Sequence, residues 1–401
     1  MKALLSLLKN DPAQVDLLSV EQILALCGSG KLTDGSECSR DFREYLQITS
    51  SDNLIRYLQT CLQGPFEKNG QALQDIVNEL GRRLDYNVEN GLYQGRSNAI
   101  GFDGLWSEPG KHTIVVEVKT SDAYRINLDR IGGYRDELIR SGKITTDSSV
   151  LLVVGRQDTG DLEAQVRGSK HAWTVRMISA EALGKLVALK ESTELASAEK
   201  IHELLVPFEY TRLDKIIEIA FTVAEEASDS EDQPADSGSI VVETSSNKQQ
   251  RTSLELIEQV RLQIVTALAS KYSPLVKKSR ALYWTADKKI RAAVTISKRY
   301  ENGGFWYAYH PEWDSFLKEG ARGILVLGCI GHEWAYAIPR EWIDARLKHL
   351  NTTERRDRSY WHAYLHPDKD GRLLFRLNNG NGEPMDQFAL PLPNPVARSA
   401  R

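Results

Sequence analysis

The sequence predicts an α/β fold: a mixed central sheet flanked by helices, preceded by an N-terminal helical unit and followed by a separate C-terminal α+β domain. Three observations lead to this prediction. Helical and strand-like patterns of apolar residues alternate between residues 66 and 222. The first 65 residues show only the helical pattern. An acidic, serine-rich segment precedes a last region that holds six of the eight tryptophans.

The length and composition are those of a globular protein with more than one core. A chain of 401 residues is expected to form two or three domains. Hydrophobic residues make up 41% and charged residues 26%, as in ordinary soluble proteins. The net charge of −4 means that binding to nucleic acid would require local basic patches. No run of about 18 apolar residues occurs, so no membrane partner is expected.

The cysteines and the start of the chain favour a cytoplasmic protein. Cys27, Cys38, Cys61 and Cys329 include no C-x-x-C pair, which argues against a structural zinc site. A disulfide scaffold is not expected in a chain of this size, so a reducing compartment fits best. The apolar first residues lack a small-residue cleavage site and are expected to form a first helix.

Four segments are predicted. Residues 1–65 form the helical unit and residues 66–222 the α/β domain. Residues 223–251 contain too few aliphatic side chains to offset the entropy lost on ordering, so a disordered acidic linker is expected. Residues 252–401 form the α+β domain.

The second segment is predicted to alternate helices and strands. Residues 69–88 have the spacing of an amphipathic helix that leads into a strand. Strands at 98–107 and 112–121 are joined by a turn that contains Pro and Gly. The apolar run at 149–155 is typical of a buried strand. The other elements expected here are helices at 127–142, 160–172 and 179–195 and a strand at 173–179.

The last region combines one long helix with strands. Residues 253–272 have helical spacing. Lysines and arginines alternate here with Tyr283, Trp284 and Tyr300, a mixture that suits phosphate contact and base stacking. A DNA-recognition or sensor module is therefore hypothesised. The strand-like runs lie at 290–300, 304–310, 323–330, 334–339 and 360–365.

The pair of strands in the second segment carries the candidate chemistry. Side chains two apart on a strand share a face, so Glu117 and Lys119 point the same way. The opposite face, with Val116 and Val118, is apolar and is expected to pack on the core. If the two strands form a hairpin, Asp103 lies beside the Glu117–Lys119 pair.

Such a group fits metal-dependent phosphodiester hydrolysis. Mg²⁺ prefers carboxylate oxygens and retains waters, and Mn²⁺ can substitute for it. Asp103 and Glu117 would hold the ion together with the carbonyl of Val118. Lys119 would orient or help to deprotonate the attacking water, or stabilise the charge that builds on the phosphate.

These residues resemble the motif of the PD-(D/E)xK nuclease superfamily, with Asp103 followed by Glu117-x-Lys119. The resemblance covers roughly residues 68–185, under a third of the chain, and is closest to Mrr-type restriction endonucleases and RecB-type nucleases. It implies a restriction-endonuclease-like sheet and cleavage of DNA. Phe102 stands where the Pro of the motif would precede the aspartate.

The resemblance implies further site residues. Members often carry a carboxylate on the first helix, for which Glu79 is the nearest match as a metal ligand and Gln74 occupies the alternative position. They also carry a later Gln or Tyr. Gln165 looks like this Gln and is a candidate catalytic residue. Tyr134 resembles the Tyr of a Gln-xxx-Tyr element in which Arg130 replaces the Gln.

Basic residues that follow the Glu-x-Lys strand are candidates for contact with DNA phosphates. Ordinary solvated helix faces would explain each of them equally well. The candidates are Arg125, Arg130, Arg167 and Lys170.

The function expected from the sequence is a metal-dependent DNA endonuclease that acts in restriction or anti-phage defence. Two alternatives remain open: a DNA repair or junction-resolving nuclease, and a non-catalytic nucleic-acid-binding protein with a nuclease-like fold. Besides DNA, two partners are hypothesised. One is a second copy of the chain, because many such nucleases dimerise to cut both strands, and the other is a partner defence subunit.

Overall fold

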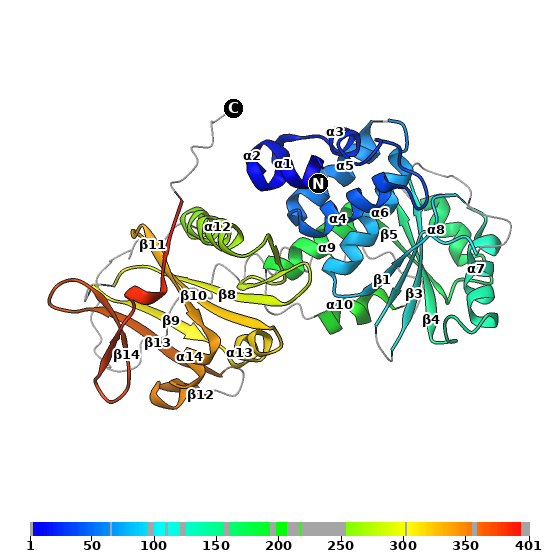
Figure 1. The fold of residues 1–401 in the computed structure, drawn as a ribbon. Coiled ribbons are helices and arrows are strands. Elements are labelled where there is room, and N and C mark those ends of the chain that lie inside the picture. Colours follow the sequence, from blue (N-terminus) through cyan, green and yellow to red (C-terminus); the bar gives the residue numbers. More distant parts are fainter. Residues whose placement is uncertain are drawn as a thin grey trace, which may run out of the picture. The chain divides into compact units, whose positions relative to one another are not determined.

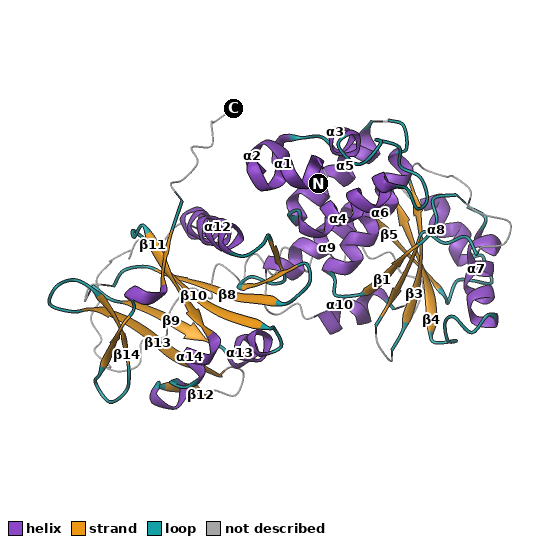
Figure 2. Cartoon of the chain, viewed as in Figure 1, coloured by secondary structure: helices purple, strands orange, loops and turns teal. Residues whose placement is uncertain are grey.

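The chain forms two compact units, Met1–Gln233 and Pro234–Arg401, in a computed structural model (Figure 1). Both units contain helices and strands (Figure 2), so the predicted α/β class is confirmed. The segment predicted to be an acidic linker, 223–251, lies outside the described residues. The structure describes residues 3–64, 66–94, 100–108, 111–120, 126–155, 160–192, 198–206, 217, 254–300, 303–354 and 359–393.

The first unit begins with five helices. Side chains that precede four of them accept hydrogen bonds from free backbone N–H groups of the first turn, which stabilises each helix start. These caps are Asp11, Ser19, Ser36 and Ser50. The helices are α1 (Ala3–Asn10), α2 (Pro12–Leu17), α3 (Val20–Ala25), α4 (Glu37–Ile48) and α5 (Ser51–Gln63).

A mixed five-stranded sheet follows, in the order β1-β2-β3-β4-β5. β1 to β3 pair antiparallel, whereas β3 to β5 pair parallel. The predicted hairpin, the buried strand and the strand after it are therefore confirmed. The strands are β1 (Asn87–Asn90), β2 (Gly104–Ser107), β3 (Thr113–Lys119), β4 (Ser148–Val154) and β5 (Val175–Ser179).

Helices cover both faces of this sheet (Figure 1). Ile114, Val116 and Val118 of β3 pack on one side in a core that also contains the five N-terminal helices, so these helices share a core with the sheet. Val115 and Leu105 pack on the other side. The first side is covered by α6 (Asn69–Arg83), α9 (Ala180–Ser192) and α10 (Ala198–Leu205), the second by α7 (Leu128–Arg140) and α8 (Gly160–Arg167).

The second unit is built on two sheets. One has six strands in the order β16-β11-β10-β8-β7-β6. The other contains β12-β13-β14-β15, with β9 paired to β13. The long helix and the strands predicted here are confirmed. The strands are β6 (Leu275–Lys277), β7 (Leu282–Thr285), β8 (Ile290–Ser297), β9 (Phe305–Tyr309), β10 (Arg322–Cys329), β11 (Trp334–Pro339), β12 (Thr352–Glu354), β13 (Ser359–Pro367), β14 (Leu373–Arg376), β15 (Gly382–Pro384) and β16 (Ala389–Pro391).

The two sheets of the second unit face each other across an apolar core. The long helix α12 (Leu254–Lys271) packs on the opposite face of the six-stranded sheet. Phe305, Tyr307 and Leu365 of the five-stranded sheet point into the shared core, together with residues of β10. The short helices are α13 (Pro311–Lys318), α14 (Arg340–Asp344), η1 (Leu347–His349) and η2 (Asp386–Phe388). Of the helices described in the two units, none is long and apolar enough to cross a membrane.

Candidate active site

The β2–β3 hairpin brings the three motif residues together. Gly104 lies opposite Val116 at the end of the regular pairing, and Asp103 N donates a further hydrogen bond of 3.0 Å to Val116 O. Asp103 therefore lies beside the end of β3, where its carboxylate accepts from Val118 N and is close enough to Glu117 and Lys119 to be influenced by both charges. The Glu117 side chain lies on the side covered by α7 and α8, because Val115, two residues before it on β3, packs there.

The backbone of Asp103 is fixed by an unusual number of donors. Its carbonyl oxygen accepts hydrogen bonds from the backbone N–H of Gly91 at 2.9 Å, from Gln74 Nε2 at 3.0 Å and from Asn78 Nδ2 at 2.8 Å. The two amides lie four residues apart on one face of α6. Its carboxylate Oδ2 accepts from the backbone N–H of Val118 at 2.7 Å. The carboxyl group is thus aimed along the end of β3.

Helix α6 packs so closely on the sheet that only glycine fits at position 104, next to Asp103. A Cβ atom there would lie 2.0 Å from Asn78 Oδ1. The same oxygen accepts a hydrogen bond of 2.9 Å from Trp106 Nε1. Asn78 therefore joins Asp103 and Trp106 to the helix, and both of its polar atoms have partners.

Glu117 and Lys119 form an ion pair, and both charges act on the nearby Asp103. The Glu117 side chain is 13% exposed and that of Lys119 is 34% exposed, so the ammonium group lies at the solvent-facing edge of the site. This matches the predicted strand pattern, in which the two charges share a face and the apolar residues share the other.

Burial and a neighbouring charge disturb the ionisation of Asp103. Burial, followed by the negative charge of Glu117, raises the pKa of Asp103 to about 7. The hydrogen bond from Val118 and the charge of Lys119 oppose this rise. The site is therefore short of positive charge at neutral pH, and a cation between the carboxylates would relieve the repulsion.

The oxygen atoms available here fit a hard divalent cation. The N–H of Val118 points toward Asp103, and the carbonyl of Val118 points to the same side of β3. The carbonyl of Lys119 points to the other side, where it accepts from Gly155 N beside β4. Two carboxylates and one carbonyl, with waters completing the shell, suit Mg²⁺. Within the described ranges, no group of three or more His, Cys, Asp or Glu side chains is arranged as a metal site.

The structure does not bring Glu79 to the motif residues. Its carboxylate is buried and pairs with Arg83 at 3.1 Å and Arg82 at 3.2 Å. Arg83 also donates hydrogen bonds to the carbonyls of Leu46 and Thr49, so the Glu79–Arg83 pair connects α6 to the N-terminal helices. Gln74, in the alternative position, instead donates to the carbonyl oxygen of Asp103, as Asn78 also does.

Gln165 lies on α8 and is half-buried. Its Oε1 accepts a hydrogen bond of 3.2 Å from the backbone N–H of Ile126, just before α7. Tyr134 packs against Gly101, two residues before Asp103, because a Cβ atom on Gly101 would be 3.1 Å from its hydroxyl oxygen. Arg130 donates to that hydroxyl.

The other predicted phosphate contacts lie on the surface. Arg167 is paired with Glu163 at 3.4 Å on α8. Lys170 is paired with Asp129 at 3.1 Å, and both side chains are exposed. Arg125 lies outside the described residues.

Sequence analysis missed two contributors to the site, Asn78 and Gly91. The spacing of Gln74 and Asn78 on one helix face was a usable signal, since two amides four apart on a buried face need partners. Next to them, buried Asp75 pairs with Arg43 at 2.9 Å and accepts from the Tyr93 hydroxyl. Burial nevertheless raises the pKa of Asp75 to about 6.

The predicted basic and aromatic residues of the second unit form a different surface. Lys278 and Lys288 each lie 4.7 Å from the centre of the Trp284 ring, and Arg291 lies 5.7 Å away. Tyr283 is buried. These cations are thus already placed over Trp284, where cation–π attraction holds them.

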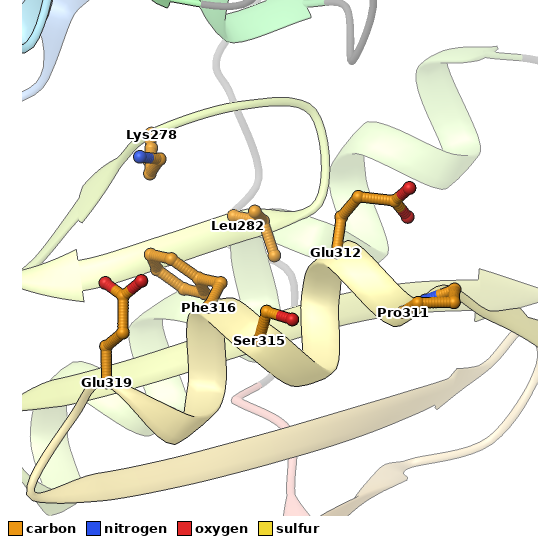
Figure 3. A pocket seen from close by; sticks show the side chains of 7 residues that line it. All are labelled: Lys278, Leu282, Pro311, Glu312, Ser315, Phe316 and Glu319. Atoms are coloured by element: carbon orange, nitrogen blue, oxygen red, sulfur yellow. The ribbon is translucent and has the colours of Figure 1, made fainter.

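A shallow pocket of about 510 Å³ borders this group (Figure 3). Glu312, Ser315, Phe316 and Glu319 line it from α13, across from Leu282 of β7. The two carboxylates disfavour a phosphate in this pocket. It is therefore a poor candidate for the nucleic-acid site expected in this region.

Comparisons with known proteins give no family for this chain: no protein-family model matches it, and no significant match exists among curated proteins.

Proposed function

We propose that this protein is a metal-dependent nuclease that hydrolyses phosphodiester bonds in DNA. The observation that carries the proposal is that the Asp103 carboxylate lies at the end of β3 close to the Glu117–Lys119 pair. Nothing in the packing of β3 requires two acids and an amine at this point, whereas burying them together is unfavourable without a cation.

The protein groups divide the work as follows. The carboxylates of Asp103 and Glu117 and the carbonyl of Val118 would hold the ion. A bound divalent cation supplies the positive charge that polarises the scissile phosphate and eases deprotonation of water. Lys119 would orient the attacking water and stabilise negative charge on the phosphate. Gln74 and Asn78 keep Asp103 in place through its carbonyl.

The order of the elements supports a restriction-endonuclease-like arrangement. A helix (α6), a strand that follows Asp103 (β2), a strand with Glu117 and Lys119 (β3), a helix (α7) and a parallel strand (β4) succeed one another. We place the activity in restriction or anti-phage defence, where a nuclease unit and a separate recognition unit would act on one DNA molecule.

The test is nicking of supercoiled plasmid by the full chain, with Mg²⁺ or with chelator. Asp103→Asn and Lys119→Ala should each lower the rate by about 100-fold or more. Lys111→Ala is the matched control, since Lys111 pairs with Glu108 in the turn at the other end of the same hairpin. This control should nick at the wild-type rate.

Nicking that survives in both Asp103→Asn and Lys119→Ala would refute the proposal. Parallel reactions with methylated and with branched DNA assign the substrate. Preference for modified or unmodified linear duplex supports defence, whereas preference for branched DNA favours a role in repair.

A further inference from the structure

A second surface with nucleic-acid chemistry lies on the five-stranded sheet of the second unit. One face of this sheet packs into the core through Phe305, Tyr307 and Leu365. The side chains between them project from the opposite face, which we call the outer face. Its central residues are Trp306 of β9, Thr353 of β12, Tyr360, His362 and Tyr364 of β13, and Arg376 of β14.

Aromatic rings line this outer face and remain partly exposed. Trp306 lies opposite Tyr364, and its ring contacts that of Tyr360 edge-on with centres 6.0 Å apart. The ring of His362 is next to both of these rings. Its centre lies 5.6 Å from that of Trp306 and 5.2 Å from that of Tyr360. Partly exposed aromatic rings on adjacent strands are the usual geometry for stacking unpaired bases.

The rings are held in fixed orientations. Trp306 Nε1 donates to His362 Nδ1 at 3.0 Å. An indole nitrogen can only donate, so Nδ1 is the acceptor and Nε2 carries the proton. Nε2 lies 2.7 Å from Thr353 Oγ1 and donates to it. Burial lowers the pKa of His362, which keeps this neutral form at physiological pH. The platform therefore needs little reorganisation to receive a planar ligand.

The charges around the rings are positive. Continuing the β13–β14 register by one residue places exposed Arg376 beside Tyr364. Lys298 lies 5.9 Å from the centre of the Tyr300 ring. Burial, and then the nearby Tyr364, raise the pKa of Tyr300. The strand registers put no Asp or Glu of the described residues on this face.

The contrast with Trp284 shows why this face is the better site. Three cations already cover the Trp284 ring, and two carboxylates line the pocket beside it. The rings of Trp306, Tyr360 and Tyr364 have no cation placed over them among the described residues, and Arg376 has no carboxylate partner there.

We infer that the outer face binds single-stranded DNA, with unpaired bases stacked on Trp306, Tyr360 and Tyr364 and phosphates near Arg376. The choice of DNA rests on the nuclease activity proposed above, whereas the stacking geometry stands without it. Single strands fit better than duplex because the rings are flat, partly exposed and close together, and bases inside a duplex are already stacked.

The test measures binding of the full chain in chelator, so that cleavage cannot interfere. Fluorescein-labelled DNA of about 12 nucleotides, single-stranded or duplex, is titrated and its anisotropy followed. Wild type should bind the single strand more tightly. Trp306→Ala should weaken this binding about tenfold, and Trp306→Phe should largely restore it, because stacking needs a ring.

Two further variants separate stacking from loss of folding. Arg376→Gln alters an exposed side chain and should lower the slope of affinity against salt by about one counterion. Trp173→Ala is the matched control, because Trp173 is 71% exposed in the first unit. It should bind single strands as wild type does. Near-ultraviolet circular dichroism checks that each variant is folded.

The outcomes distinguish this inference from the nuclease proposal. Unchanged single-strand affinity in folded Trp306→Ala and in Arg376→Gln would overturn the platform and leave plasmid nicking untouched. Duplex bound as tightly as single strand would also overturn it, and a preference for RNA of the same sequence would overturn the assignment to DNA. If the Asp103 and Lys119 variants all still nick plasmid, the nuclease proposal is refuted and the binding platform is not.

Discussion

At the scale of single residues, Asp103 is held at a cost to stability. Its carbonyl has three hydrogen-bond donors and its carboxylate a fourth, which leave it no freedom to turn away from Glu117. The pKa of about 7 reports that constraint. Strain of this kind is expected where a fold keeps charges together for a ligand rather than for stability.

Replacing this carboxyl should therefore stabilise the metal-free protein. The folded chain holds the Asp103 proton more tightly than the unfolded chain, whose pKa is near 3.8, so the group costs stability as the pH rises from about 4 to about 7. Asp103→Asn should raise the free energy of unfolding by up to about 4 kcal/mol at pH 8 and by nearly nothing at pH 4. Denaturant unfolding in chelator measures this. A loss of stability at pH 8 would contradict it.

Glu79 should behave in the opposite way. It pairs with Arg83 where both side chains are only 4% exposed, so removing its charge leaves a buried guanidinium without its counter-ion. Glu79→Gln should lower the free energy of unfolding by on the order of 3 kcal/mol. Divalent-ion affinity, measured by calorimetric titration at a temperature where the variant is folded, should not change. A large loss of affinity would make Glu79 part of the metal site.

At the scale of elements, α6 sets the position of the site from behind the sheet. Gln74 and Asn78 reach the Asp103 carbonyl, and the absence of a side chain on Gly104 allows the helix to come this close. The β2–β3 hairpin is thus only part of the candidate site, and α6 is the second part.

Removing one amide of α6 should slow cleavage more than it destabilises the fold. Gln74→Ala leaves the Asp103 carbonyl with two donors, so the expected loss of stability is about 1 kcal/mol, whereas the nicking rate should fall by about tenfold. Gln71→Ala, on the same helix, is the control and should leave the rate unchanged. Equal rates for the two variants would show that α6 does not position Asp103.

Much of this element scale could be predicted from the sequence. The hairpin with Asp103, Glu117 and Lys119 follows from alternation of charged and apolar residues, which is a local signal. The role of Glu79 did not follow, because its partner Arg83 and the carbonyls that Arg83 binds are set by packing against the N-terminal helices. Sequence spacing gives the face of a helix but not what covers it.

At the scale of the whole molecule, the chain has two sets of cores that share no residue. Helices of the first 65 residues belong to the same core as Ile114 and Val116 of β3. The second unit has its own cores around Leu365 and Val326. An apolar stripe on a helix predicts that the helix is buried, whether it packs on other helices or on a sheet. The sequence therefore could not show which helices pack on which sheet.

Damage to one set of cores should leave the other intact. Leu365 is fully buried in the second unit, and Leu365→Ala should lower the free energy of unfolding of that unit by about 2–5 kcal/mol. Scanning calorimetry should show one unfolding transition moved to lower temperature and one unmoved. Plasmid nicking should be retained at temperatures below both transitions. A single transition that shifts as a whole would contradict the independence of the two units.

The most direct test of the proposed site is binding of Mn²⁺ to the full chain. Binding is measured as the loss of the free-ion signal in electron paramagnetic resonance. If Asp103 and Glu117 share one cation, wild type takes up the ion, and Asp103→Asn and Glu117→Gln each weaken uptake by about tenfold or more. Lys111→Ala should bind as wild type does. Uptake that is unchanged in both carboxylate variants would show that these residues hold no cation, and the proposed chemistry would fail with it.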